Sequence, residues 1–196
     1  MTRRRRAADE ADMQEVGLPN PESAASAARA ICLRLLTARP RTRSELATAL
    51  RKSGVPDGCA DAVLTRFAEV GLIDDEAFAA AWVSSRHAGR GLARRALADE
   101  LRSRGVAPAV VSTALDQVDG DTEMATARHL VDRKMAGLHG VPAHACRRRL
   151  VGMLARKGYP TGLAMRVVRD ALAQSVAAGR VDGAGDVDET DTLADV

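Results

Sequence analysis

A helix ending that occurs three times constrains the fold of this 196-residue chain more than any other feature of its sequence. In each copy a Leu stands four residues before a Gly, and an apolar residue follows the Gly. The three glycines, Gly54, Gly105 and Gly158, are 51 and 53 residues apart. Glycine takes the left-handed conformation that ends a helix, and the apolar residue after it can fold back on the last turn. The spacing therefore predicts three tandem copies of one helical unit.

Apolar residues on both sides of each glycine predict two helices per unit. Two leucines four residues apart precede each glycine and share one helix face, as Leu97 and Leu101 do before Gly105. Apolar residues five, nine and ten positions after each glycine indicate a second amphipathic helix. A further helix is predicted ahead of each pair, over residues 24–38, 75–87 and 122–135.

Each unit is therefore a three-helix repeat, and it is too small to bury much apolar surface alone. Stacking of neighbouring repeats would complete the cores, so we expect an all-α, elongated and curved array. The repeats are predicted at residues 23–73, 74–120 and 121–174, between a disordered amino-terminal tail, 1–22, and an acidic, disordered carboxy-terminal tail, 175–196.

Charge is unevenly distributed along the chain. Residues 23–174 carry 24 Lys and Arg against 15 Asp and Glu, whereas residues 175–196 carry one Arg against six acids. An excess of positive charge in the central part indicates a polyanion or an acidic protein as partner. Basic side chains that only keep the surface soluble are the alternative.

The basic residues gather on equivalent helices of the second and third repeats. We expect these clusters to bind the partner or DNA, because clustering at matching positions is less expected than scatter. Only 2% of the residues are aromatic and Tyr159 is the single candidate for an exposed ring, so backbone phosphates or an acidic protein groove are favoured over base stacking. The candidate binding residues are Arg86, Arg90, Arg94, Arg95, Arg102, Arg104, Arg147, Arg148, Arg149, Arg156 and Lys157.

Candidate sites for metal binding and catalysis are weak. His139, His144 and Cys146 lack an evident fourth ligand, and the acids at 74–76 suit a helix start. The sequence contains no phosphate-binding loop or nucleophile motif, so we expect no catalysis, no metal and no cofactor. It also contains no run of about 18 uncharged apolar residues, which predicts a cytoplasmic protein without membrane contact.

Paired acids, two aromatic residues and a glycine-containing stretch follow one another between Asp74 and Val106. The residues concerned are Asp74, Asp75, Phe78, Ala79, Trp82, Arg86, the turn from Gly89 to Gly91, Leu97, Leu101 and Gly105. This pattern resembles the signature of the RecX regulatory proteins, which modulate the RecA recombinase. The flanking repeats agree in length and order, so the resemblance covers about residues 24–173.

The resemblance implies a monomeric, cytoplasmic protein of tandem three-helix repeats without a catalytic site. It also implies binding to RecA along the groove of its filament on DNA, with inhibition of the RecA ATPase, strand-exchange and coprotease activities. Recombination, DNA repair and the SOS response would be modulated in this way. Together with the basic clusters, it suggests that the array lays its basic faces into an acidic groove spanning more than one RecA subunit. Charge reversal of Arg94 and Arg95 is then expected to relieve inhibition without unfolding the protein.

Two other functions stay open on the sequence. A helical DNA-binding transcriptional regulator is one, because a short glycine-containing turn between two helices is typical of the helix-turn-helix. Sequence preference for free duplex DNA would indicate this function. A passive helical scaffold with unrelated partners is the other, and it would show no association with RecA.

Overall fold

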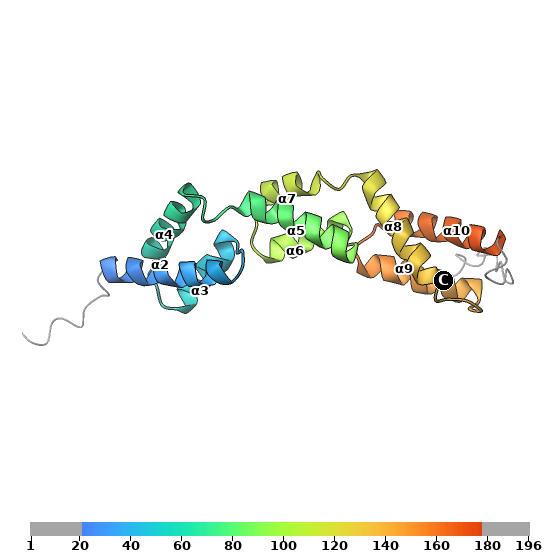
Figure 1. Ribbon diagram of the computed structural model, residues 1–196, viewed down its shortest axis with the longest axis horizontal. Coiled ribbons are helices and arrows are strands. Elements are labelled where there is room, and N and C mark those ends of the chain that lie inside the picture. The colour runs from blue at the N-terminus through green and yellow to red at the C-terminus, as the bar shows by residue number, and fades with distance from the viewer. Residues whose placement is uncertain (1–20, 178–196) are drawn as a thin grey trace, which may run out of the picture. The chain divides into compact units, whose positions relative to one another are not determined.

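A computed structural model of the chain describes residues 21–177, and this part is built from α-helices without strands (Figure 1). The predicted tails therefore lie outside the described residues, except for their innermost residues, 21–22 and 175–177, which belong to helices. The helices are α2 Pro21–Ala38, α3 Arg43–Lys52, α4 Asp57–Glu69, α5 Asp75–Arg90, α6 Arg94–Ser103, α7 Pro108–Leu115, α8 Gly120–Met135, α9 Ala143–Arg156 and α10 Thr161–Ala177. The predicted all-α fold of three tandem three-helix repeats is confirmed.

Acidic side chains begin the first helix of the second and third repeats. Asp74 Oδ1 accepts a hydrogen bond from the backbone amide of Ala77 at 2.8 Å before α5, and Asp119 Oδ1 accepts one from Thr122 at 2.7 Å before α8. The hydrogen bonds from Thr122 lower the pKa of Asp119, because they stabilise its ionised form. These carboxylates satisfy amides that the helices leave unpaired.

The end of α5 differs from the prediction. The helix continues to Arg90, three residues past its expected end, so Gly89 lies inside it and the Gly89–Gly91 turn was wrongly placed. Gly91 ends the helix instead, with φ at +60° and its amide bonded to the His87 carbonyl at 2.9 Å. A side chain at Gly91 would also collide with Leu130, since a Cβ there would lie 2.8 Å from Leu130 Cδ1.

The first repeat has an aliphatic core formed by α2, α3 and α4. Leu46, Leu50 and Leu64 are fully buried, and Phe67 is 6% exposed beside them. The two leucines of α3, Leu46 and Leu50, are the predicted pair that stands eight and four residues before Gly54. Their burial between α2 and α4 is what holds α3 in the repeat.

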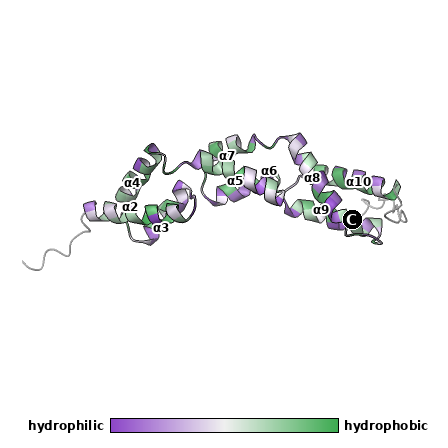
Figure 2. Ribbon diagram, in the orientation of Figure 1, coloured by the Kyte–Doolittle hydropathy of each residue, from purple (hydrophilic) through white to green (hydrophobic). Residues whose placement is uncertain are grey.

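The third repeat repeats this arrangement with α8, α9 and α10. Leu150 and Leu154 of α9 are fully buried against Val168 of α10. Figure 2 shows the amphipathic character of α10, on which hydrophobic and hydrophilic residues alternate along the ribbon. Tyr159, the single candidate for an exposed ring, is only 2% exposed, because its ring fills this core.

The described chain forms two compact units. One consists of the residues up to Phe78 together with Arg104–Val106, and the other consists of Ala79–Ser103 and the residues from Ala107 onward. Each unit contains one junction in which a glycine turn packs against the start of a helix from the preceding repeat.

In the first unit, the turn at Gly105 packs on the start of α3. A Cβ at Gly105 would overlap both Oγ and Cβ of Ser44, so only glycine fits. Thr42, which caps α3 and is fully buried, donates from Oγ1 to the Arg104 carbonyl at 2.7 Å. The backbone amide of Arg43 donates to Asp75 Oδ1 at 2.9 Å. The junction thus gives hydrogen-bond partners both to the Arg104 carbonyl, which follows α6, and to the Arg43 amide, which begins α3.

In the second unit, the turn at Gly158 packs in the same way on the start of α6. A Cβ at Gly158 would lie 2.7 Å from both the nitrogen and the Cβ of Ala96. The Ala93 amide donates to the Lys157 carbonyl at 2.9 Å, and the Arg94 amide donates to Glu123 Oε1 at 2.9 Å. The two hydrogen bonds of the first junction therefore occur again at equivalent positions, whereas the glycine contacts Ala96, which corresponds to Glu45 and stands one residue beyond the equivalent of Ser44.

Tyr159 adds a further bond to the second junction. Its hydroxyl donates to the Gly91 carbonyl at 3.1 Å. Burial raises the pKa of Tyr159, and the nearby charge of Glu123 raises it further, so the phenol remains a proton donor. The first junction has the aliphatic Val106, 4% exposed, at this position.

Gly105→Ala and Gly54→Ala form a matched pair for measuring the junction. Both glycines have φ at +74°, but no described atom lies within 4 Å of a Cβ at Gly54. Alanine at Gly54 should cost about 1–2 kcal/mol of unfolding free energy from the left-handed backbone alone. Alanine at Gly105 should cost about 1–3 kcal/mol more, because Ser44 has to move. Urea unfolding followed by circular dichroism measures both; equal losses would show that Ser44 does not confine the turn.

Candidate partner-binding surface

The structure divides the predicted binding residues into those that the fold uses and those that it leaves exposed. Arg94 belongs to the first group. Its guanidinium donates to the Leu115 carbonyl at 2.7 Å and to the Val118 carbonyl, and Asp116 lies 3.9 Å away. These bonds satisfy carbonyls at the end of α7, where a helix has no intrahelical donors left. Arg94 therefore holds α6 and α7 together within the second repeat.

Arg104 and Lys157 are the equivalent residues that precede Gly105 and Gly158. Arg104 bonds Glu45 at 2.5 Å, with side-chain exposures of 25% and 18%, so its charge is neutralised at the first junction. Lys157 donates from Nζ to the Arg90 carbonyl at 2.5 Å. Burial lowers the pKa of Lys157, and the charges of Arg133 and Arg90 lower it further. Within residues 21–177 no carboxylate pairs with Lys157, whereas Glu45 pairs with Arg104, so the cation of the second junction is less compensated.

Arg86 and Arg90 share one carboxylate with Trp82. The Arg86 guanidinium lies 4.2 Å from the centre of the Trp82 ring, which is a cation–π contact. Glu100 accepts a hydrogen bond from Trp82 Nε1 at 2.8 Å and lies 3.7 Å from both guanidinium groups. One negative charge thus serves two arginines, and Arg90 remains 59% exposed.

The remaining predicted residues are exposed. Arg102 pairs with Asp99 one helical turn away at 2.9 Å, an exposed contact that is worth little in water. For the others, no ion pair or hydrogen bond of the guanidinium is found within residues 21–177. They are Arg95 on α6 and Arg147, Arg148, Arg149 and Arg156 on α9.

Contacts at the second junction bring several of these cations together. Gly158 touches Ala96, and Arg95 and Arg156 stand one and two residues from this contact, so their Cα atoms lie within about 15 Å of each other. Leu130 touches Gly91, and Arg133 follows Leu130 by one turn on α8. Arg133 is exposed, and the sequence reasoning missed it because it stands outside the repeated helix ending.

Arg51 and Lys52 were also missed, although the repeat itself could have identified them. They occupy, in the first copy of the helix ending, the positions of Arg102 and Ser103 in the second. Both side chains are exposed, and neither has a hydrogen bond or ion pair in the described part of the chain. Aligning the first copy with the second places Arg51 at the position of the predicted Arg102.

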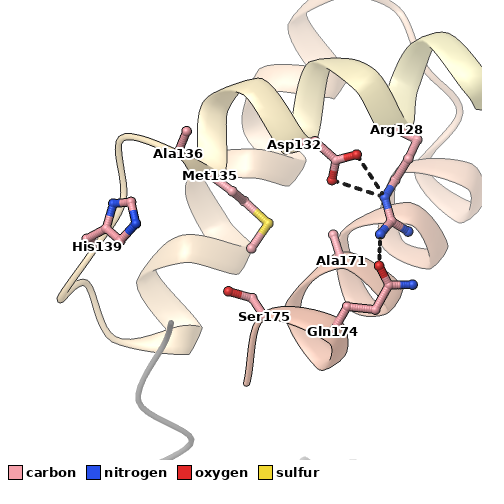
Figure 3. Close-up of a pocket in the computed structure, with 8 residues that line it drawn as sticks. All are labelled: Arg128, Asp132, Met135, Ala136, His139, Ala171, Gln174 and Ser175. Carbon is pink, nitrogen blue, oxygen red and sulfur yellow. Dashed lines mark hydrogen bonds and ion pairs between the residues drawn. The ribbon is translucent and has the colours of Figure 1, made fainter. Parts of the chain in front are cut away.

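A cavity of about 330 Å³ lies between α8 and α10 (Figure 3). Arg128 points into it, but its guanidinium is held by Asp132, at 3.1 and 3.3 Å, and by Gln174. The cavity therefore has little free charge with which to hold a ligand. Its lining residues are Arg128, Asp132, Met135, Ala136, His139, Ala171, Gln174 and Ser175.

The residues considered for metal binding are separated in the structure. Cys146 is buried and donates from Sγ to the Val141 carbonyl at 3.5 Å, whereas His139 and His144 are exposed. Over residues 21–177, no three His, Cys, Asp or Glu side chains are grouped as metal ligands. In the same range, none of the helices has the length and apolar character needed to cross a membrane.

Comparison with known proteins gives one consistent result. Models of the first, second and third three-helix domains of RecX match residues 28–67, 74–115 and 121–168. The regulatory protein RecX of Thermobifida fusca is 56% identical over 167 residues, which are 85% of this chain and 90% of that protein. The regulatory protein RecX of Streptomyces coelicolor is 58% identical over 160 residues, 82% of this chain and 85% of that protein.

A solved structure supports the fold. The crystal structure of RecX from Lactobacillus salivarius superposes with a TM-score of 0.67 and covers 76% of this chain and 97% of its own. Its sequence is only 14% identical, so the likeness is one of architecture. The tandem three-helix arrangement is thus retained where most side chains differ.

Arg94→Ala and Arg95→Ala should separate the fold-bound arginine from its exposed neighbour. Removing the Arg94 guanidinium takes a charged donor from the Leu115 and Val118 carbonyls, of which Leu115 keeps only the Val118 amide at 3.0 Å, and this should lower the free energy of unfolding by about 1.5–3 kcal/mol. Removing the exposed Arg95 should change it by less than about 0.5 kcal/mol. Chemical denaturation of the two variants measures the difference. Arg94 is therefore a poor choice for a charge reversal that has to leave the fold intact, and equal stabilities would contradict this assignment.

Proposed function

Because the chain belongs to the RecX family of regulatory proteins, we propose that it binds the RecA recombinase and its DNA filament in the cytoplasm. Binding would inhibit the RecA ATPase, strand-exchange and coprotease activities. Recombination, DNA repair and the SOS response would be modulated through this inhibition.

The observation that carries the proposal is a group of exposed arginines on α6 and α9 whose guanidinium groups have no ion pair within residues 21–177. Ion pairs between two proteins are most effective where each side arrives with unpaired charge, since no internal pair has to be broken. Arg95, Arg148 and Arg149 meet this condition, whereas Arg94 and Arg104 are engaged within the protein. The exposed group is suited to carboxylates of RecA or to phosphates of the bound DNA.

The second and third repeats would both contribute to the interaction. Each repeat offers a modest contact area, and linking several contacts in one chain raises the overall affinity without any new contact. Contacts made through more than one repeat would connect neighbouring RecA subunits of the filament and hold them in an inactive arrangement. Inhibition of all three RecA activities would then have one cause.

Arg148→Glu/Arg149→Glu tests the proposal, with Arg166→Glu/Arg169→Glu as its control. Both pairs are exposed in the third repeat, and both double substitutions change the net charge equally. We expect the α9 variant to lose about tenfold or more in inhibition of RecA ATP hydrolysis on single-stranded DNA, since charged interface contacts are worth about 1 kcal/mol or more. The α10 variant should inhibit as the unsubstituted chain does.

Three results would contradict the proposal in different ways. Equal inhibition by both variants would remove α9 from the interface. No association of the unsubstituted chain with RecA would remove RecA as the partner. Sequence-preferring binding to free duplex DNA without RecA would instead favour a DNA-binding transcriptional regulator.

A further inference from the structure

One of the three glycine turns has no partner within the described chain. The turns at Gly105 and Gly158 each pack against the start of a helix from the preceding repeat. The turn at residues 51–55 belongs to the first repeat, and no helix start within residues 21–177 packs against it. We call residues 51–55 the open turn.

The open turn has the conformation of the covered turns. Gly54 has φ at +74°, the same value as Gly105. The amides of Gly54 and Val55 donate to the carbonyls of Arg51 and Leu50, each at 3.1 Å, and the amides of Gly158 and Tyr159 make the equivalent bonds at 3.0 and 3.1 Å. The surface that two copies use for packing is therefore already formed in the first copy.

The two covered turns show what kind of structure fits on this surface. In both, a helix starts against the turn and presents a small side chain to the glycine, Ser44 in one and Ala96 in the other. In both, a group at that helix start donates to the carbonyl of the residue before the glycine. In the first junction an acid in the first helical turn, Glu45, also neutralises the basic residue there.

The open turn lacks each of these contacts within residues 21–177. No described atom lies within 4 Å of a Cβ at Gly54, and no hydrogen bond to the Ser53 carbonyl is found in this range. Arg51 and Lys52 are exposed without an ion pair there. The open turn thus offers a partner the Ser53 carbonyl as a hydrogen-bond acceptor, a glycine that allows close packing, and two cations.

A second copy of this chain does not supply a matching helix start in its third repeat. There α9 begins at Ala143 and has 14 residues, whereas α3 and α6 have 10 each. Cys146 corresponds to Ala93, because Leu150 corresponds to Leu97, and its amide already donates to the Pro142 carbonyl at 3.0 Å. The extra helical turn removes the free amide that Ala93 offers at the second junction.

We propose that the open turn docks the amino-terminal end of a helix of the protein partner, which under the proposed function is RecA. The docked helix start would carry Ser or Ala opposite Gly54 and a hydroxyl or free amide that donates to the Ser53 carbonyl. Acids in its first turn would face Arg51 and Lys52, and acids are favoured at that position by the helix dipole. The first repeat would thereby stack on the partner as the later repeats stack on their predecessors.

Gly54→Asn tests the docking, with Gly71→Asn as its matched control. Gly54 and Gly71 have φ at +74° and +73°, both have open space around a Cβ, and asparagine tolerates this conformation. The two variants should therefore fold alike, as thermal unfolding would show. A side chain at Gly54 should collide with the docked helix, so we expect about tenfold or more weaker binding to RecA filaments on single-stranded DNA. Gly71→Asn should bind as the unsubstituted chain does.

A second variant, Arg51→Glu/Lys52→Glu, should weaken the same binding and make it less sensitive to salt. If Gly54→Asn binds RecA filaments with the same affinity as the unsubstituted chain, the docking is overturned, but RecA remains the partner. Absence of binding by the unsubstituted chain would overturn both. Self-association in sedimentation that Gly54→Asn abolishes would assign the turn to a second copy and overturn the proposal as well.

Discussion

The packing of a glycine turn against the start of the preceding repeat's second helix is the contact on which the rest of this structure depends. Each three-helix repeat has a small aliphatic core, and the turn gives it a defined place to continue into the next repeat. Gly105 and Gly158 are confined by Ser44 and Ala96, so a side chain of any size would separate the backbones. The same contact gives unpaired carbonyls and amides their partners, which a buried helix end requires.

This contact also determines which cations are available to a partner. Arg104 is paired with Glu45 at the first junction, and Arg94, whose amide belongs to the second junction, directs its guanidinium to carbonyls at the end of α7. Residues one position away on the same helix, such as Arg95, stay in water without a counter-ion in the described chain. The second junction has no carboxylate equivalent to Glu45, because Ala96 stands at that position, so its cations are less compensated.

The fold was largely predictable because its determinants are local. Leucine spacing, the closing glycines and the acids at 74–76 predict the helices and the repeats, and the structure has the helices within a few residues. The candidate surface was less predictable. Arg94 and Arg95 are adjacent in sequence, but the first bonds carbonyls of its own repeat and the second is exposed. Helical periodicity could not predict the bonds of Arg94, because the carbonyls are more than 20 residues away. Tyr159 was misjudged for the same reason, since its hydroxyl partner is Gly91.

The sequence by itself determined which segments are helical, which faces are apolar and how many times the unit is repeated. These properties follow from neighbouring residues, since helix capping and amphipathic spacing act over one or two turns. Only the tertiary structure decided which glycine turns are covered and which basic side chains are free. Those properties depend on contacts between residues such as Gly158 and Ala96, about 60 positions apart, where the packing geometry and not the sequence pattern selects the partner.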